Sequence, residues 1–227
     1  HLASHGFVVV APQMYPPGNP GNAPSIAEEV EGSRAVLQWL STQLATTIST
    51  PITTNNIGIA GHSRGGQVAW RVSLADPSAV SGIAGVDPVD GEGDPFSGDT
   101  GPLVTDSPFG LPFPSLVLGT GLGPEAAFGG LSPPCAPDGQ NHEQFFAASA
   151  PPAWHLIADE HGHNDMLDDS CGVECLACSS GPDLPAMRRF VAGQLVAYFS
   201  HVQKGFDGID FLSNSSPAPL AVSAEQK

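Results

Sequence analysis

The sequence predicts an α/β protein with a mostly parallel central sheet flanked by helices. Five short runs rich in β-branched residues are apolar on both faces, as parallel strands are when helices cover each side. Helical patterns stand between and after these runs, and this alternation is typical of an α/β sheet. With 227 residues, 41% of them hydrophobic, the chain is long enough for one such domain.

The predicted strands lie at residues 6–12, 56–63, 80–89, 114–121 and 153–163. Between the first two, residues 24–45 have apolar side chains at helical spacing, and Ser25 with Glu28 forms the signature of a capping box. A short helix is predicted over residues 64–76 and a strongly periodic one over 184–202. The order of these elements is that of a sheet with helical crossovers.

We expect residues 1–203 to form the domain and residues 204–227 to be a flexible tail. The last fifteen or so residues are small and polar and include two prolines, a composition that rarely packs. No stretch reaches the roughly 18 consecutive apolar residues of a membrane-spanning helix. There is no initiator Met or basic leader at the start, so the residues do not indicate a compartment.

The charge balance excludes one class of partner. The chain has 23 acidic and 7 basic residues, a formal net charge of −16 and a pI near 4.5. Such a surface repels phosphate backbones, so no nucleic-acid partner is expected.

The most informative motif is Gly-His-Ser-Arg-Gly at residues 61–65. A predicted strand precedes it and a predicted helix follows it, which is the context of a nucleophile on a sharp strand-to-helix turn. We expect the two flanking glycines to remove Cβ atoms that would clash with the strand and the helix. Ser63 is therefore the candidate nucleophile, and the backbone N–H of Arg64 is the candidate donor to an oxyanion.

A serine hydroxyl needs a base to activate it, and histidines after strands are the candidates. His163 follows the last predicted strand, and Gly162 allows its loop to turn inward, so His163 is preferred to His161. His62 adjoins the nucleophile; a hydrogen-bonding or packing role is favoured for it, with a contact to substrate as the other possibility. The remaining histidines are expected to be structural: His1, His5, His155 and His201.

The orienting acid is expected where a strand ends. Asp87 stands at the end of the predicted strand 80–89, whereas Asp90 lies in a Pro/Gly turn. The next strand ends in GTGLGP without a carboxylate, which strengthens the case for Asp87. Asp138 and Glu143 remain alternatives, because their loop follows that strand and could approach the imidazole.

Three features bear on metals and on the substrate cleft. Cys171, Cys175 and Cys178 are clustered and Cys135 is distant; a disulfide that pins the loop after His163 is favoured over a zinc site or free thiols. The acidic run at residues 165–169 is better explained by a helix N-terminus than by a cation. Met14, Tyr15 and the apolar loops 107–116 and 123–135 are candidates to line a cleft.

Seven motifs in this order carry a family resemblance: GHSRGG, GVDPVDG, GTGLGP, PPCAP, NHEQFF, GHNDMLDD and MRRFVAG. Together they resemble chlorophyllase, an α/β-hydrolase that cleaves the phytyl ester of chlorophyll, over about residues 1–203. The resemblance implies an α/β-hydrolase fold and a triad of Ser63, Asp87 and His163. It also implies chlorophyll or a related phytylated pigment as substrate, chlorophyllide and phytol as products, no cofactor, a plastid location, and at most peripheral contact with pigment-bearing membranes.

The chain departs from that family at its beginning. Family members have earlier strands, one of which ends in a His-Gly loop that supplies a second oxyanion amide. We expect their absence to leave a gap in the sheet between residues 6–12 and 56–63, and the 227-residue chain alone to be poorly folded and nearly inactive. Two other functions stay open: a different serine esterase, acting on phospholipids or polyesters, and a pigment-binding homologue without catalysis.

Overall fold

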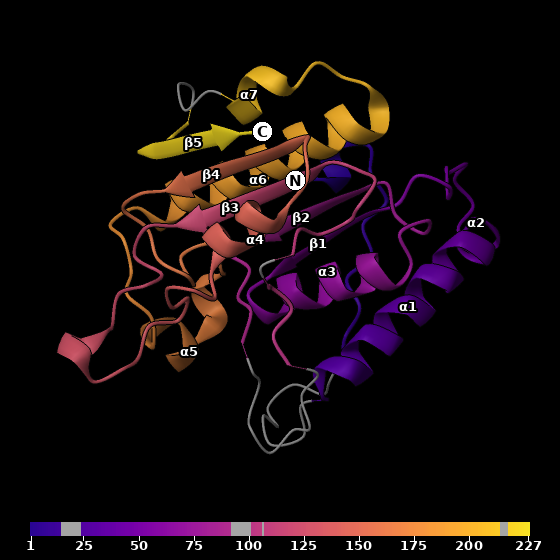
Figure 1. Cartoon of the computed structure of the whole chain (residues 1–227). Helices are drawn as coiled ribbons and strands as arrows, with labels where there is room; N and C mark the ends of the chain where they lie inside the picture. The colour runs from indigo at the N-terminus through magenta and orange to yellow at the C-terminus, as the bar shows by residue number, and fades with distance from the viewer. Residues whose placement is uncertain (15–23, 92–100, 106, 214–217) are drawn as a thin grey trace.

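A computed structural model of the chain describes residues 1–14, 24–91, 101–105, 107–213 and 218–227 (Figure 1). The helices are α1 (Ile26–Thr42), α2 (Leu44–Thr47), α3 (Arg64–Ala75), α4 (His142–Ala148), α5 (Val173–Leu176), α6 (Leu184–Lys204) and α7 (Ile209–Ser213), with short 3₁₀ turns η1 (Ala3–His5), η3 (Phe128–Gly130) and η4 (Asp169–Cys171). The strands are β1 (Gly58–His62), β2 (Gly82–Val86), β3 (Ser115–Thr120), β4 (Ala153–Ala158) and β5 (Val222–Gln226).

These strands form one sheet in the order β1-β2-β3-β4-β5, as Figure 1 shows. The first four strands are parallel, and β5 runs antiparallel to β4. Every residue of β2 and β3 is buried, as expected for strands that are covered on both faces. The mixed α/β architecture predicted from the sequence is confirmed, and it is the arrangement of an α/β-hydrolase sheet.

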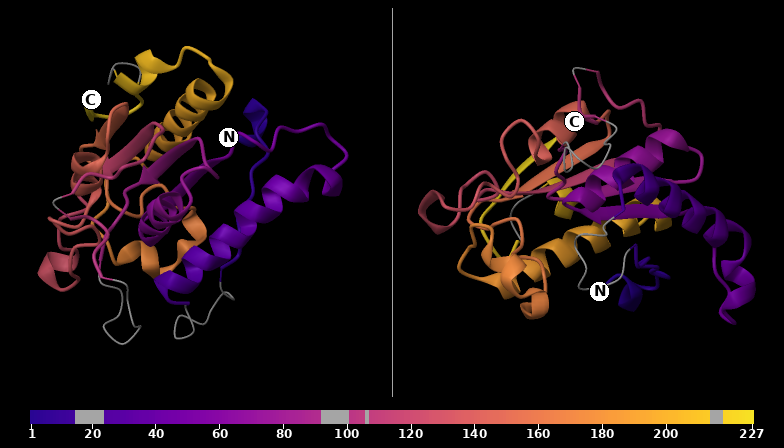
Figure 2. Two further views of the ribbon diagram at one scale, coloured as in Figure 1. Left: turned by 45° about the vertical axis from the view of Figure 1, so that its right-hand side comes forward. Right: turned by 90° about the horizontal axis from the view of Figure 1, so that it is seen from below.

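Two apolar layers cover the sheet. On one face, Leu116 and Leu156 pack with Phe190 and Tyr198 of α6. On the other face, strand side chains such as Ile83 pack with Trp70 of α3 and with α4, and α1 packs in turn against α3 (Figure 2). The carboxyl ends of the parallel strands therefore meet at one edge of a rigid, buried platform.

Helix α1 begins as its sequence predicts. The Ser25 hydroxyl accepts a hydrogen bond from the Glu28 amide, and the Glu28 carboxylate accepts one from the Ser25 amide at 2.8 Å. The capping box is therefore confirmed, and it satisfies amide groups that the first turn of a helix leaves without a partner.

The prediction of a strand over residues 6–12 is wrong. These residues have no strand assignment, and Val8 and Val9 are more than half exposed. A strand forms only when a neighbour completes its hydrogen bonds, and in the described residues this segment is separated from β1 by a groove of about 880 Å³. The groove is lined by residues 6–12, by Ala60 of β1 and by Phe199 of α6.

The flexible tail expected over residues 204–227 also differs from the structure. Within the described part of this stretch, α7 packs on α6 and β5 extends the sheet at its far edge. Val222 and Ala224 face the core layer, whereas the residues between and after them are exposed. This alternation with period two is the signal of a half-buried edge strand, and two nearby prolines concealed it in the sequence.

In the described residues, no helix combines the length and the apolar character that crossing a bilayer requires.

Candidate active site

Ser63 lies on a sharp turn between β1 and α3. Its backbone has φ 54° and ψ −127°, a conformation that residues other than glycine rarely adopt. Its amide donates a hydrogen bond to the carbonyl oxygen of Val86 at 3.1 Å, so the turn is tied to the end of β2. The strained backbone of Ser63 is held between β1 and α3, and this conformation places the hydroxyl beyond the end of β1.

The glycines around Ser63 have different roles. A Cβ on Gly61 would collide with the carbonyl oxygen of Gly65, and a Cβ on Gly66 would lie 2.6 Å from the Cβ of Pro88. A Cβ on Gly65 would meet no atom within 4 Å. The expectation that both flanking glycines prevent a clash is therefore right for Gly61 and wrong for Gly65; the second close approach belongs to Gly66, which faces the segment after β2.

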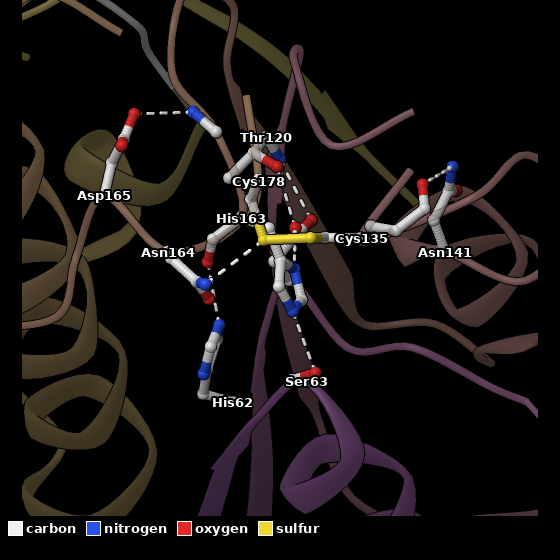
Figure 3. A network of polar contacts seen from close by, with 12 residues as sticks. His62, Ser63, Thr120, Cys135, Asn141, His163, Asn164, Asp165 and Cys178 are labelled. Carbon is white, nitrogen blue, oxygen red and sulfur yellow. Dashed lines mark hydrogen bonds and ion pairs between the residues drawn. A yellow bond between two sulfur atoms is a disulfide. The ribbon is translucent and has the colours of Figure 1, made fainter. Parts of the chain in front are cut away.

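A line of hydrogen bonds joins Ser63, His163 and Asp87 (Figure 3). His163 Nε2 lies 2.8 Å from the Ser63 hydroxyl, and His163 Nδ1 lies 2.6 Å from Asp87 Oδ2. Because the carboxylate accepts, Nδ1 carries the ring proton, and Nε2 is left with a lone pair toward the serine. The structure thus brings together, from three strand ends, the three residues that the sequence nominated.

The Asp87 carboxylate is fully buried and is held by a residue that the sequence reasoning missed. The Thr120 hydroxyl donates to Asp87 Oδ2 at 2.7 Å, and the Thr120 amide donates to Oδ1 at 3.1 Å. Thr120 is the last residue of β3 and belongs to the GTGLGP motif, which contains no carboxylate of its own. Its place at a strand end beside the candidate acid was the signal that could have found it.

The loop that carries His163 is fastened by a second buried carboxylate. Asp165 Oδ2 accepts hydrogen bonds from the amides of Gly162 and Gly181, each at 2.7 Å, and Oδ1 accepts one from the Ser180 hydroxyl at 2.6 Å. Asp165 therefore closes the loop on itself.

In the described part of the chain, no group of three or more His, Cys, Asp or Glu side chains is arranged to hold a metal ion.

The alternative acids and base lie elsewhere. His161 is buried, with Nε2 3.1 Å from the carbonyl oxygen of Asp183 at the start of α6. The Asp90 carboxylate accepts hydrogen bonds from Gln67 at 2.6 Å and from the amides of residues 103 and 104. Asp138 lies in the loop before α4 and Glu143 in the exposed first turn of that helix, and in the described residues no hydrogen bond joins either to the imidazole.

His62 supports the backbone of the candidate base. Its Nε2 lies 2.8 Å from the carbonyl oxygen of His163, and the two rings pack with centroids 4.7 Å apart. Burial, with a further contribution from the His163 ring, lowers the pKa of His62 to about 4, so the ring is neutral near pH 7 and its Nε2–H donates the hydrogen bond. The structure favours the hydrogen-bonding role that sequence reasoning preferred over a contact with substrate.

The side chains of the other candidate site residues have contacts outside the line of hydrogen bonds from Ser63 to Asp87, or lie outside the described residues. The Arg64 guanidinium donates to buried Glu29 at 2.7 Å and to the Pro24 carbonyl at 2.8 Å, so it fastens α3 to the start of α1. The Arg64 amide is in the first turn of α3, where N–H groups have no acceptor within the helix. Met14 is half-buried against Gly32 of α1. Tyr15 lies outside the described residues.

The apolar loops expected to line a cleft divide into two kinds. Phe109 is buried in the layer formed with Trp70 and Phe145, with ring centroids 6.3 Å from each. Phe128 and Leu131 are 61% and 89% exposed. The loop 107–116 therefore contributes to the core, and only the loop after β3 presents large apolar side chains to its surroundings.

All four cysteines form disulfides. Cys135 pairs with Cys178, and Cys171 pairs with Cys175. The first bond joins the loop after β3 to the loop that follows His163, and the Asn164 amide group lies 3.1 Å from the Cys178 sulfur (Figure 3). The predicted disulfide that pins the loop after His163 is confirmed, and its partner is the distant Cys135.

Comparison with known proteins identifies the family. The profile of the family described as Chlorophyllase matches residues 1–226. The chain is 38% identical over 224 residues to Chlorophyllase-2 of Arabidopsis thaliana, which covers 91% of this chain and 68% of that protein. It is 35% identical over 220 residues to Chlorophyllase-1 of Arabidopsis thaliana (88% and 65%), and 36% identical over 233 residues to the chloroplastic Chlorophyllase-1 of Citrus unshiu (97% and 68%).

The chain spans about two thirds of the length of these relatives, and the match extends over nearly all of its own residues. Sheet, strand-end site and similarity agree: the chain belongs to the chlorophyllase family of carboxylic-ester hydrolases.

Proposed function

We propose that this chain hydrolyses the phytyl ester of chlorophyll to chlorophyllide and phytol through an acyl-enzyme, with Ser63 as nucleophile, His163 as base and Asp87 as orienting acid. The observation that carries the proposal is the unbroken line of hydrogen bonds from the Ser63 hydroxyl to the Asp87 carboxylate, at 2.8 and 2.6 Å. The substrate is proposed from the names of the relatives, which are all chlorophyllases.

In the acylation step, His163 Nε2 takes the hydroxyl proton as Ser63 Oγ attacks the ester carbonyl carbon. The imidazolium that forms is stabilised by Asp87, which also keeps Nδ1 protonated beforehand. The developing oxyanion faces the first turn of α3, where the Arg64 N–H is available to donate a hydrogen bond. When the tetrahedral intermediate collapses, His163 returns its proton to the departing phytol oxygen.

In the deacylation step, water replaces the alcohol. His163 Nε2 removes a proton from the water as its oxygen attacks the acyl carbon, and Ser63 leaves with that proton. The product is the carboxylic acid of the pigment, chlorophyllide. In both steps, His163 Nε2 is the group that accepts and returns the proton.

The decisive experiment compares the chain with Ser63→Ala and with Ser78→Ala, an exposed serine that serves as a matched control. Turnover on detergent-dispersed chlorophyll and on a short p-nitrophenyl ester, and pigment binding by fluorescence quenching, are measured on the 227-residue chain and on a longer chain that also carries the N-terminal strands of the family, because the 227 residues alone are expected to be nearly inactive. We expect Ser63→Ala to lose on the order of 10³-fold or more in turnover while pigment binding persists. Ser78→Ala should keep both.

A fluorophosphonate probe gives a second readout that needs no turnover, because it phosphonylates an activated serine. Mass spectrometry should locate the adduct on Ser63 in the unmodified chain and find none in Ser63→Ala. Absence of the adduct from folded, unmodified chain would overturn the proposed nucleophile. A strong preference for the short ester would instead indicate a different esterase. If the unmodified chain and Ser63→Ala bind pigment equally and neither turns it over, the protein would be a pigment-binding protein.

A further inference from the structure

The environment of Asp87 shows how its carboxylate is kept in one orientation. Oδ2 receives two donors, the His163 ring at 2.6 Å and the Thr120 hydroxyl at 2.7 Å, and Oδ1 receives the Thr120 amide at 3.1 Å. Thr120 therefore makes two of these three contacts. Because one comes from the backbone and the other from the side chain of a single strand-end residue, together they fix both the position and the rotation of the carboxylate.

The carboxylate is enclosed tightly enough that bulk water cannot substitute for Thr120. Asp87 and Thr120 both have no exposed surface. Gly123 closes the site from the side of the loop after β3: a Cβ there would lie 2.8 Å from Thr120 Oγ1 and 3.3 Å from Asp87 Oδ2. A lost hydroxyl would thus leave a buried, charged oxygen without one of its donors, which is costly in such surroundings.

The backbone of Asp87 is also held by a hydrogen bond to β3. Its φ of 43° is in the left-handed region, which a residue with a side chain rarely occupies, and its amide donates to the Leu118 carbonyl at 2.6 Å. The main chain is therefore tied to β3 just before Thr120. The carboxylate still has its own torsions, and the Thr120 hydroxyl restrains them through a second hydrogen bond to Oδ2, the oxygen that also accepts from His163.

Thr120 is itself supported from behind. Gly119 beside it packs against the ring of His142, since a Cβ on Gly119 would collide with that ring. His142 Nδ1 lies 2.8 Å from His155 Nε2 in β4, so α4 and β4 brace the end of β3 together. The residue that holds the acid is thus built into the rigid part of the sheet.

We infer that Thr120 is a positioning residue for ester hydrolysis: its hydroxyl orients the Asp87 carboxylate so that Asp87 holds the His163 ring with Nδ1 protonated and Nε2 facing Ser63. The inference rests on the proposed function, because it assigns Thr120 a role within the same site. It predicts that losing the hydroxyl reduces the rate of the chemical step and leaves substrate binding unchanged.

The test uses three variants of the chain. Thr120→Val keeps the shape and strand preference of threonine and removes the hydroxyl, Thr120→Ser keeps the hydroxyl, and Thr120→Ala removes both hydroxyl and methyl. Loss of a hydrogen bond to a charged group predicts a decrease in kcat of roughly 10- to 100-fold for Val and Ala with KM unchanged. Thr120→Ser should restore kcat to within about threefold of the unmodified chain.

A spectroscopic readout applies even to protein that turns over slowly. The proton shared by His163 Nδ1 and Asp87 should give a far-downfield proton NMR signal in the unmodified chain and in Thr120→Ser, and this signal should shift or broaden in Thr120→Val. Thermal unfolding of each variant shows whether it is folded, and the Ser/Ala pair replaces Val if Val does not fold. A packing role alone would change stability without moving this signal.

The outcomes separate this inference from the proposed function. Turnover that survives Ser63→Ala would mean that the proposed function is wrong. If Ser63→Ala abolishes turnover while Thr120→Val keeps the kcat and the downfield signal of the unmodified chain, only the role of Thr120 is refuted. Equal losses in Thr120→Ser and Thr120→Val would also refute it, because the hydroxyl would then make no difference.

Discussion

Ser63 and Asp87 share an unusual backbone property. They are two of the three residues other than glycine that have positive φ in the described part of the chain, at 54° and 43°. Such conformations cost on the order of 1–3 kcal/mol each, and they persist where the surroundings over-determine them. Here each follows the end of a parallel strand and precedes a stiff segment, α3 in one case and Pro88 in the other. With these backbone conformations, the side chains of Ser63 and Asp87 lie at the same edge of the sheet, where β1 and β2 end.

The glycines beside Ser63 give a test with a matched control. Gly61→Ala should lower the free energy of unfolding by about 1–3 kcal/mol or more, because its Cβ would collide with the backbone of Gly65. Gly65→Ala should leave stability unchanged or raise it by up to about 1 kcal/mol, since that Cβ would enter open space in a helix. Urea unfolding followed by circular dichroism measures both. Equal effects of the two substitutions would show that the turn does not need Gly61.

Among the elements, the loops after β3 and β4 matter most for the site. The Cys135–Cys178 disulfide joins them, and the Ser132 hydroxyl donates to the Ala177 carbonyl at 2.7 Å. The Asp165 carboxylate closes the same region around Gly162 and Gly181. His163 therefore stands on a loop that is cross-linked to its neighbour, which explains how a residue outside any helix or strand is held within hydrogen-bond distance of Ser63.

The two disulfides should contribute unequally to stability. Cys135 and Cys178 are 43 positions apart, whereas Cys171 and Cys175 are 4 apart. Chain-entropy estimates give about 4 kcal/mol for closing the long loop and about 2 kcal/mol for the short one. Replacing both cysteines of the long pair with serine should thus lower the free energy of unfolding by roughly twice as much as the same change in the short pair.

Chemical unfolding under non-reducing conditions measures this difference, and fluorophosphonate labelling of Ser63 measures its effect on the site. Labelling should slow in the variant without the long disulfide, because the loop of His163 then has more freedom. The variant without the short disulfide is the control. If both variants label at the rate of the unmodified chain, the long disulfide does not position His163.

The whole molecule contains buried imidazoles whose neutral form the fold requires. Burial lowers the pKa of His62 to about 4, and burial with the neighbouring His142 lowers that of His155 to about 3; the nearby Asp87 carboxylate opposes both shifts. His155 also faces Glu225 of β5 and Lys227, the residue that follows this strand. In unfolded chains these rings take up a proton near pH 6.5. Folding therefore depends on their staying uncharged.

This predicts how stability changes with pH. A folded pKa below the unfolded value means that stability is fully present above about pH 6.5 and is lost as the pH falls toward the folded pKa values, because only the unfolded chain binds the protons. Each such ring contributes up to about 1.4 kcal/mol per pH unit. Unfolding free energies measured from pH 7 to pH 4 should fall accordingly.

His155→Phe should make that pH dependence shallower, because it removes a buried ring that binds a proton near pH 6.5 only in the unfolded chain. Phenylalanine suits the position because the His155 ring already stacks on Phe146, with centroids 4.8 Å apart. Exposed His5→Gln is the control and should leave the slope as it is. A slope that is identical in all three proteins would show that burial of His155 is not coupled to folding.

Local patterns were enough for most of the architecture. Four of the five predicted strands, the capped helix α1 and the long helix α6 follow from periodicity and end signals within a single segment. The Gly-His-Ser-Arg-Gly motif indicates Ser63, and Asp87 and His163 are candidates because they stand where predicted strands end, at the carboxyl edge that parallel strands share. Short-range chemistry is sufficient for such inferences, since each depends on only a few neighbouring residues.

Contacts between distant segments account for the rest. Residues 6–12 have the composition of a strand, yet β1 lies across a groove from them, and residues 222–226 form a strand because β4 offers an open edge. The hydroxyl of Thr120 reaches Asp87 from 33 positions away, and Ser63 meets His163 across 100. Residue types and spacing show which groups could do the chemistry. Which of them meet is set by how strands and loops far apart in the chain pack, because hydrogen bonds depend on distances that no single segment contains.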